Sequence, residues 1–511
     1  MPMAKEVGGH ATQVHPGVRA AAPHGLSSGR IDEIVSAHLA KAGVAAAAPV
    51  SDEVFLRRVY LDAIGTLPSA GEAKSFLANR DPNRRAQLID QLLDRDEFAI
   101  YRAMQWSDVL CIKAEFPINL WPVAAQEYYR WLLESLRANQ PANQFARELV
   151  AASGSNFRVG PANFYRALQN RDPQSLAQAA ARVLLGARTE KWPAERRNQL
   201  AVFFSQVGYK PTGEWKEEIV FFDPSKPLPS TAAVFPDGTR AQIASGSDPR
   251  LAFAGWLTAD KNPYFARCIV NRIWAWVYGR GIVDEPDDFR ADNPPIYPDL
   301  LDELATELIR SGYDQKHIYR TILNSSVYQQ SAMPRSKSAE AARQFCCYPL
   351  RRLDAEVLID AICQITGTSE QYSSAVPEPY TIMPGDERAV ALADGSISSP
   401  FLETFGRSPR NTGMESERNN KPSTAQRLHM LNSSHIERKI EQGPALDAIF
   451  KLNDPRAVID TLYLTILSRY PTADEVKLAT AYAQSSNINR RQAAVDLSWA
   501  LVNSTEFLYR H

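Results

Sequence analysis

The chain repeats a short signal that starts α-helices. Asp or Asn stands directly before Pro, ahead of apolar residues at helical spacing, at residues 81–82, 172–173, 248–249, 262–263 and 454–455. The polar side chain can accept hydrogen bonds from the free amides of the first turn, and proline has a φ that suits that turn. Two capping-box patterns, Ser69 with Glu72 and Thr472 with Glu475, give the same signal. The chain is therefore predicted to be mainly α-helical.

Apolar residues recur with the helical period over most of the chain, for example at Leu88, Ile89, Leu92 and Leu93. The exception lies within 207–247, where 218–222 has the pattern of a strand and 234–239 that of strand, turn and strand. Single hydrophobic cores stop growing near roughly 250–300 residues, and this chain has 511. We therefore predict two helical domains, 29–206 and 248–511, joined by a linker at 207–247 with a small β excursion near 215–245.

The totals exclude several classes of protein. Lys plus Arg (57) nearly equals Asp plus Glu (58), so no net field would attract nucleic acid. No stretch approaches the roughly 18 uninterrupted apolar residues of a membrane span. The five cysteines show no Cys-x-x-Cys spacing, which argues against a disulfide framework and against a thiolate metal site. Residues 1–28 lack the apolar stretch of a secretory signal and are predicted to be a disordered leader.

Long, collinear motifs resemble a bacterial domain pair. Residues 55–68 and 88–93 are similar to the opening of the second planctomycete cytochrome-associated domain. Further motifs resemble the first planctomycete-specific domain from its start to its last helix. They lie at residues 262–267, 271–274, 279–283, 287–290, 293–295, 351–357, 405–410 and 503–507. The resemblance implies two helical domains of unknown function in an extracytoplasmic or periplasmic protein.

The chain departs from this family where haem would be attached. Relatives commonly carry Cys-x-x-Cys-His after the Leu-Gly that ends a helix, but here Leu185-Gly186 runs directly into 187–192 without cysteine or histidine. Covalent haem needs both thiols and the histidine as axial ligand. Likewise, 413–418 stands where relatives often have cysteines before Glu-Arg. We therefore expect no bound cofactor in this chain.

The densest acidic cluster is a loop between two predicted helices. It contains Asp284, Glu285, Asp287, Asp288 and Asp292. Such oxygen-rich loops can hold calcium, although the spacing of an EF-hand is absent. The alternative, which we favour, is a structural loop in which Asp288 pairs with Arg290 or Arg272.

A second charged group, Arg351, Arg352, Asp354, Glu356 and Asp360, is predicted to lie on one helix. On that helix Arg352 and Glu356 would face the same way. Neighbouring carboxylates can raise each other's pKa, as acid–base catalysis requires. An ion-pair ladder on a solvated helix face is the simpler explanation.

The segment 405–432 is dense in arginine and asparagine. Planar guanidinium groups suit carboxylate, sulfate or phosphate. We therefore predict a ligand site whose binding residues are Arg352, Arg407, Arg410, Arg418 and Asn432. An equally weighted alternative is an interdomain lock, in which these arginines bind the acidic loop at 284–292.

These observations favour a non-catalytic binding or assembly component that recognises an anionic glycan or another exported protein, with no nucleic-acid partner. One alternative is a hydrolase or lyase that acts on a glycan and uses Glu356, Asp288 or Glu417 as acid–base groups beside Arg410. A third hypothesis is a redox accessory that docks a separate cytochrome.

Overall fold

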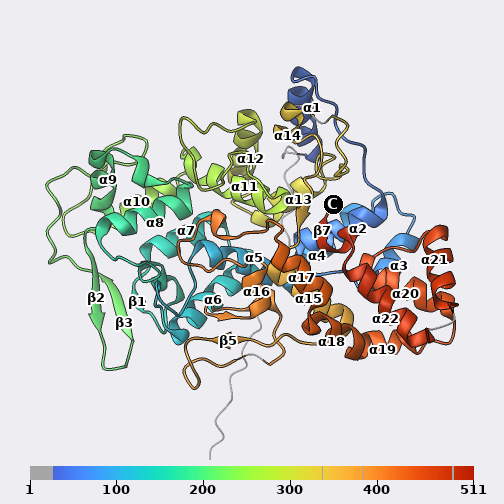
Figure 1. The fold of residues 1–511 in the computed structure, drawn as a ribbon. Helices are drawn as coiled ribbons and strands as arrows, with labels where there is room; N and C mark the ends of the chain where they lie inside the picture. The colour runs from blue at the N-terminus through green and yellow to red at the C-terminus, as the bar shows by residue number, and fades with distance from the viewer. Residues whose placement is uncertain (1–26, 337, 384, 486–487) are drawn as a thin grey trace, which may run out of the picture.

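The computed structural model describes residues 27–336, 338–383, 385–485 and 488–511. In these ranges the protein is mainly α-helical, as predicted, with a few short strands (Figure 1). The predicted leader lies outside the described residues up to residue 26, and the first helix begins at Ser28. Within the same ranges, no helix combines the length and the apolar character that a bilayer crossing needs.

The helices follow one another with short connections over most of the chain. The N-terminal helices are α1 (Ser28–Lys41), α2 (Asp52–Ala63), α3 (Ala70–Ala78), α4 (Arg84–Asp94), α5 (Asp96–Val109), α6 (Pro122–Arg137), α7 (Ala142–Ala151), α8 (Pro173–Leu185) and α9 (Ala194–Ala201). The middle helices are α10 (Pro249–Leu257), α11 (Pro263–Tyr278), α12 (Pro298–Arg310), α13 (Gln315–Leu323) and α14 (Ala339–Arg343). The C-terminal helices are α15 (Ala355–Thr366), α16 (Pro400–Thr404), α17 (Thr424–Asn432), α18 (Ser434–Gln442), α19 (Pro444–Phe450), α20 (Pro455–Leu467), α21 (Ala473–Ala483), α22 (Arg490–Val502) and α23 (Thr505–Leu508).

Most of the predicted helix starts are confirmed by their caps. The side chains of Asp172, Asp248, Asn262 and Asp454 each accept a hydrogen bond from a first-turn amide. Both predicted capping boxes form, at the start of α3 and of α21. The exception is Asp81, whose carboxylate accepts from the amide of residue 83 in a turn just before α4.

The predicted strand at 218–222 is confirmed, but the predicted strand, turn and strand at 234–239 are not formed in full. Residues 218–222 form β3 (Glu218–Phe222), the middle strand of an antiparallel sheet between β1 (Gly154–Ser155) and β2 (Val207–Pro211). Residues 234–239 form only an isolated bridge, between Val234 and Arg240. Because β1 precedes the predicted linker, this sheet ties the linker to the N-terminal helices, at one edge of the molecule (Figure 1).

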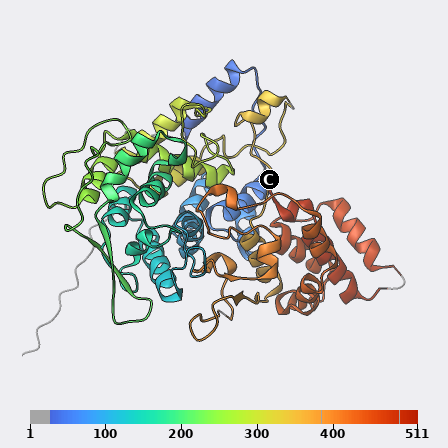
Figure 2. The ribbon, with the colours of Figure 1, turned by 60° about the vertical axis from the view of Figure 1, so that its left-hand side comes forward.

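The buried hydrophobic side chains form two clusters that do not divide at the linker. One cluster is drawn almost wholly from residues 31–348 and the other mainly from 353–507. Helix α10 packs on α7 and α11 packs on α8, so helices from before and after 207–247 share one core. The division between the cores lies near residue 350, and Figures 1 and 2 show the red C-terminal helices on the opposite side of the molecule from the green part.

Helix α5 lies between the two cores. Its Trp106 belongs to the first cluster, whereas Tyr101 and Met104 belong to the second. Most of its surface is therefore buried, and Asp108 near its C-terminal end is carried into the interior of the molecule.

The predicted helix through 351–360 is wrong at its start. Arg351 and Arg352 form the short strand β4 (Arg351–Arg352), which pairs with β7 (Tyr509–Arg510) at the end of the chain. Helix α15 begins only at Ala355, and its Glu356 is fully buried. A solvated ion-pair ladder on one helix is thereby excluded. A third pair of short strands, β5 (Ser373–Ser374) and β6 (Ile397–Ser398), lies within 369–400.

Candidate functional site

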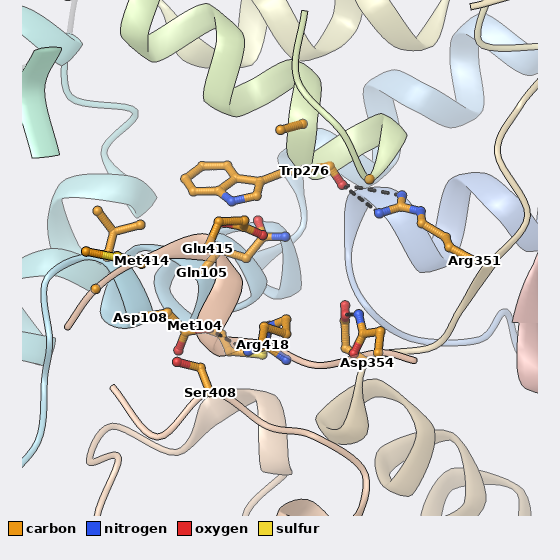
Figure 3. A pocket seen from close by; sticks show the side chains of 15 residues that line it. Met104, Gln105, Asp108, Trp276, Arg351, Asp354, Ser408, Met414, Glu415 and Arg418 are labelled. Atoms are coloured by element: carbon orange, nitrogen blue, oxygen red, sulfur yellow. Dashed lines mark hydrogen bonds and ion pairs between the residues drawn. The ribbon is translucent and has the colours of Figure 1, made fainter. Parts of the chain in front are cut away.

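A small charged cavity of about 160 Å³, called the central cavity below, is lined by side chains from both halves of the chain (Figure 3). It is smaller than the roughly 300–1,000 Å³ of sites for drug-sized ligands. Four parts of the chain build it: α5, the end of α11, the segment from β4 to the start of α15, and the loop 406–420. Its polar lining consists of Gln105, Asp108, Arg351, Asp354, Ser408, Glu415, Arg418 and Asn420.

Arginines of the 406–420 loop reach a fully buried carboxylate, Glu356, and a half-buried one, Asp108. The Arg418 guanidinium donates to both oxygens of Glu356, at 2.7 and 3.0 Å, and to Asp108 Oδ2 at 2.6 Å. Arg410 Nε donates to the other oxygen of Asp108 at 2.9 Å, and its side chain is fully buried. Paired fork geometry of this kind is the strong form of a charge-assisted hydrogen bond. The loop is thus locked against α5 and α15.

A second ion-pair centre adjoins the first. Arg510 Nη2 donates to Asp354 Oδ2 at 2.8 Å, and Asn420 Nδ2 donates to Asp354 Oδ1 at 2.7 Å. Burial alone would raise the pKa of Asp354, but Arg510 and other nearby arginines outweigh it and hold that pKa far below its ordinary value. Arg351 makes a 2.8 Å ion pair with Asp62, which is fully buried. Most of the charge around the cavity is therefore neutralised internally.

Glu415 is the exception among the lining acids. Its half-buried side chain lies beside Gln105 in the cavity (Figure 3), and within the described residues its carboxylate makes no hydrogen bond or ion pair. Burial raises the pKa of Glu415 to about 7, although Arg272 and Arg418 act in the opposite direction. The cavity therefore holds two contrasting carboxylates. Asp108 is paired with two arginines, whereas Glu415 has a pKa of about 7.

Replacing Glu415 with glutamine is expected to stabilise the protein at pH 8 and to change little at pH 4. The folded-state pKa of Glu415 lies above the unfolded value, so the fold disfavours ionisation, and this penalty develops as pH rises from about 4.5 to above 7. The gain at pH 8 should be on the order of 1–2 kcal/mol. Chemical denaturation of both proteins at the two pH values measures it. An equal effect at both pH values would show that Glu415 does not titrate in this range.

The other predicted acid–base groups have structural partners. Glu417 accepts hydrogen bonds from the backbone amides of Asn411, Thr412 and Gly413, at 3.2, 3.0 and 3.2 Å, and so shapes the loop. Glu356 is enclosed by Arg418 and by Arg407, whose Nε lies 3.5 Å from it. Neither residue lines the cavity.

The predicted ligand-binding residues do not form one exposed site. Arg407 is buried and donates to the carbonyl of Ile397, and burial lowers its pKa to about 10. Arg352 donates to Gln426, not to Glu356, and covers the ring of Phe405 at 4.7 Å. Asn432 is exposed at the end of α17 and does not line the cavity. An open arginine surface for an anionic polymer is thus not what these residues build.

The acidic loop has partners of its own. Arg188 pairs with Glu285 and, at 2.8 Å, with Asp287, while Arg290 lies 3.2 Å from Asp288 and 3.3 Å from Asp292. The predicted pair between Asp288 and Arg290 is confirmed. The predicted contact between this loop and the 407–418 arginines is wrong, because those arginines pair with Asp108 and Glu356 instead. In the described ranges, Asp284 and its neighbours form no group of three side chains that could hold a metal ion.

Sequence reasoning missed Asp108, Glu415, Asp62 and Arg510. One signal was available for Asp108, since a carboxylate near the end of a helix that is otherwise mostly apolar needs a partner when buried. Nothing local pointed to Arg510, whose partner Asp62 lies at the other end of the chain.

Comparison with known families gives two matches. Residues 30–191 match PSCyt2, described as a protein of unknown function (DUF1549), and residues 249–483 match PSD1, described as a protein of unknown function (DUF1553). Both are the domains, in the order, that the resemblance predicted. No curated protein and no solved structure matches the chain. The cavity is built by both matched ranges, because α5 lies in the first and the remaining lining residues lie in the second.

Proposed function

The chain belongs to the proteins in which a PSCyt2 domain precedes a PSD1 domain, and from its central cavity we propose a non-catalytic binding role. The ligand is a small, hydroxyl-rich unit, such as the end of a glycan chain. The observation that carries this proposal is the unpaired carboxylate of Glu415 in a cavity whose other acids are paired. By the family resemblance, binding takes place outside the cytoplasm.

The free polar atoms of the lining suit hydroxyl groups, which both donate and accept. Glu415 offers carboxylate oxygens, the Oδ1 atom of Asn420 is buried without a partner, and so is Nε of Arg351. Trp276, Met104 and Met414 add apolar surface to the lining. A few polar groups set in an apolar wall are typical of small-molecule sites.

A glycan-active hydrolase or lyase is the second candidate, on one specific observation. Asp108 and Glu415 share the cavity in contrasting surroundings, which is how paired carboxylates divide acid and base roles. Glu415 would donate the proton, and Asp108, paired with Arg410 and Arg418, would supply the second carboxylate. This pair replaces Glu356, Asp288 and Glu417 as the acid–base candidates.

Binding is tested by isothermal titration with neutral mono- and oligosaccharides, for the wild type and for E415Q. We expect the variant to bind about tenfold or more weakly, because a hydrogen bond to a charged group is lost. E437Q is the matched control, since Glu437 is exposed on α18 and outside the cavity, and it should bind like the wild type. Equal affinity of E415Q and the wild type would refute the proposal, and release of shorter saccharides during incubation would favour the hydrolase or lyase.

A further inference from the structure

A second cavity, of about 590 Å³, lies against α17 and α18 and shares no lining residue with the central one. The segment 368–371 and the start of α16 complete its wall. Its side chains include four basic groups and a single acid, which are His429, His435, Arg438, Lys439 and Glu370. This composition is the reverse of an acidic cation site.

Hydrogen bonds join the acid and both imidazoles into one chain. Glu370 Oε2 lies 2.9 Å from His435 Nε2, and His435 Nδ1 lies 3.2 Å from His429 Nε2. Lys439 Nζ lies 3.3 Å from the same oxygen of Glu370. Burial would raise the pKa of Glu370, but His435 and Lys439 outweigh it and keep that pKa below its ordinary value.

The carboxylate sets the tautomers of both rings. Because ionised Glu370 can only accept, Nε2 of a neutral His435 carries the hydrogen and its Nδ1 accepts. Nε2 of His429 must then donate, which leaves His429 Nδ1 without a hydrogen. When both imidazoles are neutral, this hydrogen-bonded series therefore ends in the basic nitrogen Nδ1 of His429. Protonation in acid converts that nitrogen into a cationic donor. Phe401 packs its ring edge-on against both imidazoles, at 5.5 and 6.0 Å between centroids, and fixes the pair.

The charge of this cavity is positive and rises with acid. Glu370 and Lys439 neutralise each other, while exposed Arg438 contributes an added positive charge at the rim. Cys363 of α15, behind Lys439 at 3.4 Å, and Tyr372, which interacts with Glu370, are further titratable groups near the pair; burial raises the pKa of both, so they stay neutral. Burial, reinforced by His435, lowers the pKa of His429. Protonation of His429 is therefore expected in mildly acidic solution.

We propose that this cavity is a binding site for a small oxyanion, a carboxylate or sulfate group, and that protonation of His429 strengthens the binding. A cationic imidazole and a guanidinium in one half-enclosed cavity supply charge-assisted donors to the oxygens. At neutral pH His429 Nδ1 carries a lone pair and cannot donate to an anion, so anion binding is weaker. The proposal does not depend on the central cavity.

The test is isothermal titration with sodium sulfate and with glucuronate, at pH 5.5 and pH 8 and at constant ionic strength. We expect affinity for at least one of the two probes to rise about tenfold at pH 5.5, as one positive charge is added close to the anion. H429Q should lose this pH dependence, and R438Q should bind about tenfold more weakly at both pH values. Sulfate and glucuronate titrated separately distinguish a sulfate ester from a carboxylate as the natural group.

Two controls decide the result. R456Q removes an exposed arginine on α20, outside this cavity, and should bind like the wild type. E415Q should also bind both probes like the wild type. The proposal for this cavity and the proposal for the central cavity can therefore be refuted separately. Because Arg438 is exposed, R438Q keeps the fold even if H429Q does not. Affinity that does not change with pH, or that R438Q leaves intact, would overturn the proposal.

Discussion

Arg418→Met is expected to lower the free energy of unfolding by about 3–5 kcal/mol, because it strips two enclosed carboxylates of a shared counter-charge. The Arg418 guanidinium bonds to Glu356 at 2.7 and 3.0 Å and to Asp108 at 2.6 Å, and Glu356 is fully buried. Arg407, 3.5 Å from Glu356, is the remaining cation close to it. Denaturant unfolding at pH 7 measures the loss.

Two further variants separate the buried pair from general damage. In R418M/E356L both buried charges are removed together, so its loss should be smaller than the sum of the two single losses. R456M breaks an exposed pair between Arg456 and Asp460 on α20 and should cost only about 0.3–0.5 kcal/mol. Equal losses for R418M and R456M would show that the central network contributes no more than a surface pair.

Gly406→Ala should destabilise the protein by about 2–4 kcal/mol and loosen the loop that carries the central arginines. Gly406 has a φ of +86°, which disfavours side chains, and an added Cβ would lie 1.9 Å from the carbonyl oxygen of Asn419. The amide of Asn419 donates to the carbonyl of Gly406 at 3.0 Å, so this contact closes both ends of the loop. Thermal unfolding and the rate of proteolysis within 406–420 measure the effect.

Gly213 provides the matched control. It lies between β2 and β3, has no positive φ, and an added Cβ would meet nothing within 4 Å. G213A should therefore unfold like the wild type. If G406A and G213A were equally stable and equally resistant to proteolysis, the close approach at Gly406 would not hold the loop.

The family ranges and the physical cores divide this chain at different places. PSCyt2 ends at residue 191 and PSD1 begins at 249, yet helices on both sides of that gap pack into one hydrophobic cluster. The second cluster is drawn mainly from residues after 350, with a few side chains from the first matched range, such as Tyr101 and Met104 of α5. Neither matched range would bury all of its own apolar surface alone, so we expect the two to fold as one unit.

Helix existence and many helix starts were predictable from the sequence because capping is local. Asp172, Asn262 and Asp454 each act on an amide two residues away, and no distant part of the chain has to be known. The same holds for β3, where a short run of β-branched and aromatic residues was correctly predicted as a strand. At Arg351 and Arg352 local reasoning failed, because pairing with Tyr509–Arg510 outweighs helix propensity there.

The site was only partly predictable. The expectation that the 407–418 arginines pair with acids elsewhere in the chain was right, but it named Asp288 and its neighbours instead of Asp108 and Glu356. Glu415 carries the proposed function, and in sequence it is one acid among several.

The sequence by itself determined most helix starts and the strand β3, since capping and apolar periodicity act over a few residues. The tertiary structure decided which charges meet. Asp62 pairs with Arg510, 448 residues further on, and Asp108 with Arg410, 302 residues further on. Coulomb attraction and burial depend on distance in space, and the packing of α5 between two cores brings these side chains together.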